Sequence, residues 1–139
     1  MSNYFEKHRS EYYARLLAVS QRGEWEEWLA FFLTGIRIQS HEATQRVQNL
    51  QSLREKYYQM FAGKRDSVRL NKLVDFLIGH PIITIRQVEE GLKVADYKIA
   101  QRYIAKLQDA GILRETTGKS RNRVFRADEI LKVIKGSPN

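Results

Sequence analysis

The sequence predicts a mainly helical protein, with a helical segment over residues 1–66 and a smaller domain containing a β-hairpin over residues 67–139. Over most of the chain, apolar residues recur at three- and four-residue steps, which is typical of helices packed along one face. Two short β-branched runs break this pattern only in the second half, and glycines stand where helices are expected to end. The 139 residues are enough for a core without disulfide or metal staples.

The first helix is expected to begin at Asn3 and to stop at Gly23. Glu6 follows Asn3 by three residues, which is the spacing of a capping box at a helix start. The apolar face of this helix would carry Tyr4, Phe5, His8, Tyr12, Leu16 and Val19.

The second helix is expected to begin near Glu24 and to continue to about Ala62. A helix of this length is longer than the helices of small domains usually are. Acidic residues in its first turn suit the positive end of the helix dipole. Gly63, followed by the basic pair at residues 64–65, would close it.

Two helices cannot cover all the aromatic side chains near the start of the second one. Four of them are the candidate interface residues: Trp25, Trp28, Phe31 and Phe32. Plain core or interface packing explains such side chains better than a ligand-binding role. They could be covered by a second copy of the chain, by the rest of a larger fold, or by the C-terminal segment folding back.

After residue 67 the pattern predicts a helix over about 69–79, which ends before a proline, and a short strand over 82–84. Thr84 and Gln87 have the spacing of a capping box. We therefore expect a short helix over 85–92.

The next helix is expected over 97–110, with Asp96 as its N-cap and Gly111 as its end. The side chains at 100, 104 and 107 share one face and are assigned to the core. The opposite face is then available for a partner.

A second strand pair is expected over 113–116 and 123–126, joined by a polar turn, and Asp128 would cap a last helix over 129–135. The order is then helix, strand, helix, tight turn, helix, hairpin, helix. This order predicts a winged helix-turn-helix domain.

The chain carries 24 Lys and Arg against 16 Asp and Glu, a net charge of +8. Residues 1–66 hold 10 basic and 8 acidic residues, and residues 67–139 hold 14 and 8, so the excess is +2 and +6 respectively. A basic excess in one segment favours a polyanionic partner, with nucleic acid first and an anionic membrane surface second. A merely soluble basic surface is the alternative.

In a helix-turn-helix protein the second helix of the motif enters the major groove of DNA. The outward face of the helix over 97–110 would carry Lys98, Arg102 and Lys106, with Gln101 beside them. Arg102 and Gln101 are the candidates for reading bases, whereas Lys98 and Lys106 would meet phosphates. The hairpin tip adds the remaining candidates, Lys119, Arg121, Asn122 and Arg123, which could straddle the DNA backbone or enter the minor groove.

Catalytic and cofactor signals are weak. The chain has no cysteine, which excludes thiol chemistry and Cys-based metal sites, and no phosphate-binding glycine loop. His8, His41 and His80 lie on separate predicted elements without metal-ligand spacing, so no catalytic residue, metal or cofactor is assigned. The first residues do not resemble a signal peptide, and no apolar run could span a bilayer, so a cytoplasmic location is expected.

Residues 4–13 (YFEKHRSEYY) and 23–33 (GEWEEWLAFFL) closely resemble the closing part of the Fic family. That resemblance implies AMP transfer from ATP to target hydroxyls by the parent protein, and a winged-helix domain after the catalytic region. The catalytic signature of the family, HPFxxGNGR, has no counterpart here, because His80-Pro81-Ile82 is followed by Thr-Ile-Arg-Gln. The chain thus resembles a C-terminal part of a Fic-like protein, and no catalytic residue carries over.

The leading expectation is a non-enzymatic, DNA-binding winged-helix module with a role in regulating transcription. Its partner would be double-stranded DNA, and no membrane is involved. The alternative is a protein-interaction or dimerisation module that regulates a Fic AMP transferase or recruits its targets, through a homodimer or by docking on a Fic catalytic region.

Overall fold

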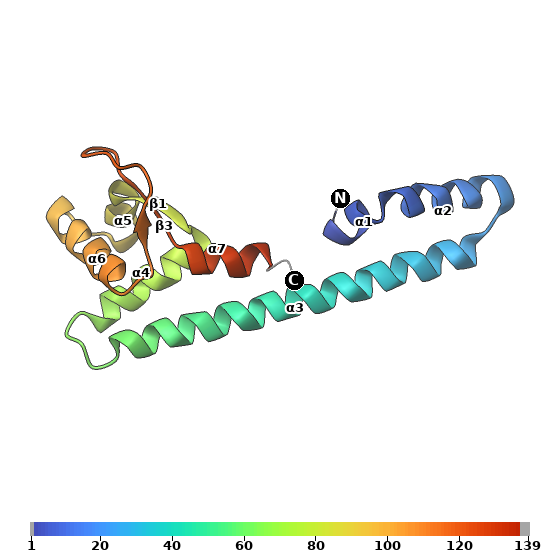
Figure 1. The fold of residues 1–139 in the computed structure, drawn as a ribbon. Coiled ribbons are helices and arrows are strands. Elements are labelled where there is room, and N and C mark those ends of the chain that lie inside the picture. The colour runs from blue at the N-terminus through green and yellow to red at the C-terminus, as the bar shows by residue number, and fades with distance from the viewer. Residues whose placement is uncertain (1, 137–139) are drawn as a thin grey trace. The chain divides into compact units, whose positions relative to one another are not determined.

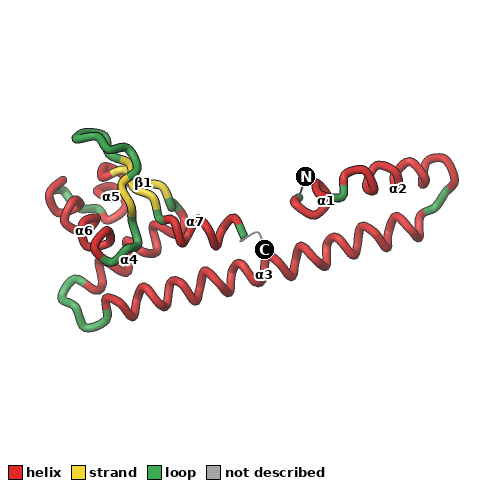
Figure 2. Tube along the Cα trace, in the orientation of Figure 1, coloured by secondary structure: helices red, strands yellow, loops and turns green. Residues whose placement is uncertain are grey.

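The computed structural model describes residues 2–136 and divides into two compact units, one up to Val47 and one from Gln48 onward. Helix α3 (Trp25–Phe61) is unbroken and contributes to both units (Figure 1). The described chain is mainly helical with one small antiparallel sheet, which confirms the predicted fold class (Figure 2). Within residues 2–136, none of the helices combines the length and the apolar character needed to cross a membrane.

The first unit contains α1 (Asn3–Lys7), α2 (Arg9–Arg22) and the first part of α3. The single helix predicted up to Gly23 is wrong, because His8 leaves helical geometry with φ −109° and ψ 30° and separates α1 from α2. The capping box at Asn3 is also wrong, since Ser2 is the N-cap and its hydroxyl accepts a hydrogen bond from the Gln39 amide instead. Gly23 does end α2, in a left-handed conformation with φ 69°.

Phe5 is the centre of the packing in this unit, and only 6% of it is exposed. Its ring centroid lies 5.8 Å from that of Phe31 and 5.5 Å from that of Phe32. Gly35 gives the ring room, because a Cβ built there would lie 2.6 Å from the Phe5 Cζ atom. A close approach that only glycine allows therefore positions α1 on α3.

The second unit adds four helices and three strands to the end of α3. In chain order they are α4 (Ser67–Gly79), β1 (Ile82–Thr84), α5 (Ile85–Leu92), α6 (Tyr97–Asp109), β2 (Arg114–Glu115), β3 (Val124–Arg126) and α7 (Asp128–Lys135). Among the described residues the sheet has the strand order β1-β3-β2, with both pairs antiparallel and Ile83 opposite Phe125. This is the element order that the sequence predicted for a winged helix-turn-helix domain.

The core of this unit gathers apolar side chains from every helix and from the sheet. Its fully buried members include Leu73, Val74, Leu77, Ile83, Val88, Ile104, Leu107, Phe125 and Ile130. Tyr57 and Phe61 join the same core from α3. The division between the compact units falls inside α3, between residues 47 and 48, whereas the sequence analysis placed its domain boundary after residue 66.

In the second unit, two predicted caps are confirmed and one is wrong. The Thr84 hydroxyl accepts from the Gln87 N–H while the Gln87 side chain accepts from the Thr84 N–H, which completes the capping box of α5. The Asp96 carboxylate accepts from the Lys98 N–H at 2.9 Å and caps α6. Asp128 lies inside α7, with Ala127 as the N-cap, because its carboxylate pairs with arginines on β2 and β3.

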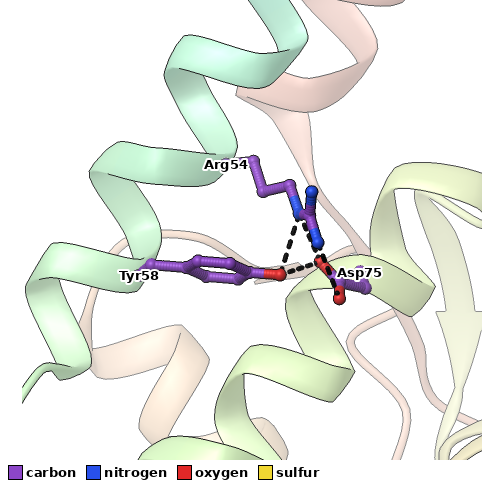
Figure 3. A network of polar contacts seen from close by, with 3 residues as sticks. All are labelled: Arg54, Tyr58 and Asp75. Carbon is purple, nitrogen blue, oxygen red and sulfur yellow. Dashed lines mark hydrogen bonds and ion pairs between the residues drawn. The ribbon is translucent and has the colours of Figure 1, made fainter.

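A polar network joins α3 to α4 within the second unit (Figure 3). The Arg54 guanidinium donates to the Asp75 carboxylate at 2.7 and 3.3 Å, and the Tyr58 hydroxyl donates to the same carboxylate. Partial burial raises the pKa of Asp75, but the hydrogen bonds from Arg54 and Tyr58 outweigh this and leave the pKa below its usual value. The network fixes the end of α3 against the core.

Candidate nucleic-acid interface

The whole net charge of the chain belongs to the second unit. Residues 1–47 carry 6 basic and 6 acidic residues, whereas residues 48–139 carry 18 and 10, which is the full excess of +8. This is a sharper separation than the sequence boundary at residue 66 suggested. An excess of positive charge on a small domain attracts polyanions.

Helix α6 presents Lys98 and Arg102 to solvent, as the sequence predicted, while its apolar face is buried. Neither cation has a carboxylate oxygen within 4.0 Å in the described chain. Gln101 is half-buried at the flank of the helix. Two long donors on the outward face are therefore available to an anionic partner.

Lys106 was expected to contact DNA phosphates, but its ammonium group is already paired with the Asp66 carboxylate. The Tyr103 hydroxyl donates to the same carboxylate at 3.4 Å. The hydrogen bond from Lys106, together with its charge, lowers the pKa of Asp66 despite some desolvation. Lys106 thus ties the start of α4 to α6.

The hairpin between β2 and β3, called the wing, is organised at its base by Glu115. Its carboxylate accepts from the Thr117 hydroxyl and from the backbone N–H groups of Thr117 and Gly118, at 3.0 and 2.9 Å for the two N–H groups. These hydrogen bonds lower the pKa of Glu115. The wing therefore leaves the sheet in a defined direction.

The wing residues predicted to bind DNA separate into two groups. Lys119, Arg121 and Asn122 are exposed, and Asn122 adopts a left-handed conformation with φ 52° in the turn. Arg123 instead lies over the Phe125 ring, with its Cζ atom 5.7 Å from the ring centroid and a buried Nε that has no hydrogen-bond partner among residues 2–136. Arg123 is thus better placed to brace the wing than to reach a ligand.

Sequence reasoning missed Arg65. A hollow of about 330 Å³ is lined by Arg65, Asp66, Arg102 and Lys106, so that the loop before α4 and the outward side of α6 share one surface. In the sequence, the basic pair at 64–65 was interpreted only as the close of the long helix. Its charge was a visible signal, but the pairing of Asp66 with a residue 40 positions away was not.

The four aromatic interface candidates in the first unit do not form one exposed surface. Trp25 is 59% exposed, whereas Trp28 and Phe32 are half-buried. Phe31 is only 7% exposed and packs inside its own unit, so its assignment to an interface is corrected. The aromatic side chains are therefore partly, and not wholly, covered by their own helices.

Across the part of the chain that the structure describes, no three His, Asp or Glu side chains come together as metal ligands. His41 is exposed on α3 and His80 stacks on Phe76 at the end of α4, as the sequence predicted for a helix-surface and a helix-end residue. His8 is exposed too, but it lies in the turn between α1 and α2 and not on a helix surface as predicted. No known protein-family model matches the chain. The candidate site is thus defined by its own geometry and charge.

Proposed function

We propose that the second unit binds duplex DNA, with α6 in the major groove and the wing against the adjacent backbone. The concentration of the entire +8 charge in this unit carries the proposal. Free cations on two separate elements, α6 and the wing, support it further, because non-specific affinity for DNA comes from cations that neutralise phosphates. The role is regulatory and non-enzymatic.

Within this proposal the side chains have different tasks. Arg102 and Gln101 lie where a groove-bound helix meets base edges, and an arginine can pair bidentately with guanine. Lys98, Lys119 and Arg121 contact phosphates, which positions the protein without reading sequence. Lys106 and Arg123 hold the framework in place through Asp66 and Phe125.

Charge-removing variants test the proposal by fluorescence anisotropy with a labelled duplex at fixed salt. The double variant Lys98→Ala/Arg121→Ala should weaken binding at least tenfold, since each phosphate contact contributes to affinity. Lys132→Ala removes the same kind of charge from an exposed position on α7 and is the single-site control. If the double variant binds DNA no more weakly than the control, α6 and the wing are not the interface.

A second function, self-association through α3, is favoured by a specific pattern. Residues 29, 33, 36, 40, 43 and 47 follow each other at alternating steps of four and three, which is the spacing of a coiled-coil seam. Leu29, Leu33 and Val47 are 49%, 61% and 54% exposed. A second copy of the chain supplies a matching helix, so we propose a homodimer through this seam as the alternative.

The mass of the chain in solution, measured by light scattering after size exclusion, tests this alternative. The seam variant Leu29→Glu/Leu33→Glu should convert a dimer to a monomer, whereas Thr34→Glu, at an exposed position off the seam, should not. A wild-type monomer would exclude the homodimer and leave docking on another protein as the use of this face.

We also propose, from the resemblance of residues 4–13 and 23–33, that the chain corresponds to the C-terminal part of a Fic-like protein without its catalytic signature. The chain should then transfer no labelled AMP from ATP to protein targets. Measurable transfer would contradict the assignment of a non-enzymatic role.

A further inference from the structure

The hollow between the loop before α4 and the side of α6 contains more positive than negative charge. Arg65, Arg102 and Lys106 line it together with a single acid, Asp66. Lys106 already neutralises Asp66 through a direct ion pair. The two guanidinium groups of Arg65 and Arg102 are left with no carboxylate oxygen within 4.0 Å in the residues that the structure describes.

The backbone holds this loop in a fixed form. The Lys64 N–H donates to the Phe61 carbonyl and the Ser67 N–H donates to the Lys64 carbonyl, each at 3.1 Å. Asp66 is the N-cap residue of α4, but its side chain makes no capping hydrogen bond and instead contacts Tyr103 and Lys106 on α6. Arg65 and Arg102 thereby line the same hollow, although 37 positions of sequence separate them.

Two arginines that line one hollow, each without a direct ion pair in the described part of the chain, can receive a phosphate group. The guanidinium group is planar and offers parallel N–H donors that match two oxygens of a phosphate. The hollow, with a volume of about 330 Å³, also has room for a phosphate with bound water. Lys106 adds a third cation that can share its charge between Asp66 and the incoming anion.

We propose that this hollow is a phosphate-binding site formed by Arg65 and Arg102, with Lys106 as a supporting cation. The phosphate belongs either to a DNA backbone flanking the groove that α6 enters, in which case Arg102 contacts this phosphate in place of a base edge, or to a small free anion. Only the DNA source rests on the proposed function. The site itself is independent of it.

Nuclear magnetic resonance titrations of the full chain distinguish these sources. Inorganic phosphate, compared with sodium chloride at equal ionic strength, should shift the signals of residues 65, 66, 102 and 106 in a saturable way. A short duplex should shift the same signals at much lower concentration. Arg65→Ala should weaken phosphate binding at least fivefold, while Lys72→Ala, an exposed charge removal on α4 away from the hollow, should not. The unshifted signals of the core report that each variant is folded.

Each outcome decides one question. Shifts with both ligands support a backbone-phosphate site, and shifts with inorganic phosphate alone support a free-anion site while the proposed function fails. A third outcome is that DNA shifts the signals of α6 and the wing but not those of the hollow, and that Arg65→Ala changes neither phosphate nor DNA binding. That result would leave DNA binding by the second unit intact and would overturn the phosphate site. The phosphate site would also be overturned if phosphate and chloride shift the signals of the hollow equally and DNA does not shift them.

Discussion

Gly35 lies inside α3 where the ring of Phe5 crosses it, and replacing it with alanine puts two effects in opposition. Alanine favours a helix interior over glycine by up to about 1 kcal/mol. The added Cβ, however, would lie 2.6 and 2.7 Å from two Phe5 ring atoms and 2.8 Å from a Tyr4 ring atom. Carbon atoms normally meet at about 3.5–4.0 Å, so the Phe5 ring must move by about 1 Å.

The Phe5 ring has little room for that movement. It is 6% exposed, and its face is stacked against Phe32 at a centroid distance of 5.5 Å. Overpacking of this kind costs about 1–3 kcal/mol. The steric cost therefore exceeds the helix gain, and we expect a net loss of about 1 kcal/mol in the free energy that holds α1 on α3.

Native-state hydrogen exchange of the α1 and α2 amides is the appropriate measurement, because α1 has only five residues and can open without the rest of the chain. Gly35→Ala should speed exchange in α1 about fivefold. Gly79→Ala, where an added Cβ has no described atom within 4 Å, is the control and should leave α1 unchanged. Slower exchange in α1 with Gly35→Ala would refute the packing argument.

Three further predictions concern the second unit. Leu77→Ala should lower its free energy of unfolding by about 3 kcal/mol, measured by urea denaturation, because the side chain is 0% exposed; a loss under 1 kcal/mol would contradict a close-packed core. The pKa of Asp75 is lowered in the folded protein, so its contribution to stability is present above the unfolded-state value of about 4 and is lost as pH falls through the lower folded value. Asp75→Asn should therefore flatten the dependence of stability on pH in this acid range, and an unchanged profile would exclude the Arg54 contact as its source. Glu115→Gln should speed exchange of the Gly118 amide several-fold with little change in the unfolding midpoint, and unchanged exchange would mean that another contact orders the wing.

Elements with a local signal were predictable from the sequence. The capping box of Thr84 and Gln87 and the cap at Asp96 depend on residues two or three positions apart, and both are confirmed. Glycines with positive φ, such as Gly23 and Gly63, end helices for a reason that is also local. The long helix was predictable because its apolar period continues through both units.

What the sequence could not predict depends on partners far along the chain. His8 lies within a regular apolar period, yet the helix breaks there as Phe5 packs on α3. Asp128 has the form of an N-cap, but its carboxylate pairs with Arg114 on β2. The candidate site shows the same limit, since the exposure of Lys98 and Arg102 follows from the helical period of α6 alone, whereas the role of Arg65 requires the contact that brings its loop to α6.

The binding of a labelled random-sequence duplex by the wild-type chain, measured over a salt series, is the most direct test of a DNA-binding second unit. With phosphate contacts from Lys98, Lys119 and Arg121, the slope of log K against log salt concentration should be about −3, a loss of roughly 40-fold in affinity between about 50 and about 200 mM salt. Absence of binding at the lowest salt, or affinity that does not depend on salt, would contradict DNA binding through the basic face of this unit.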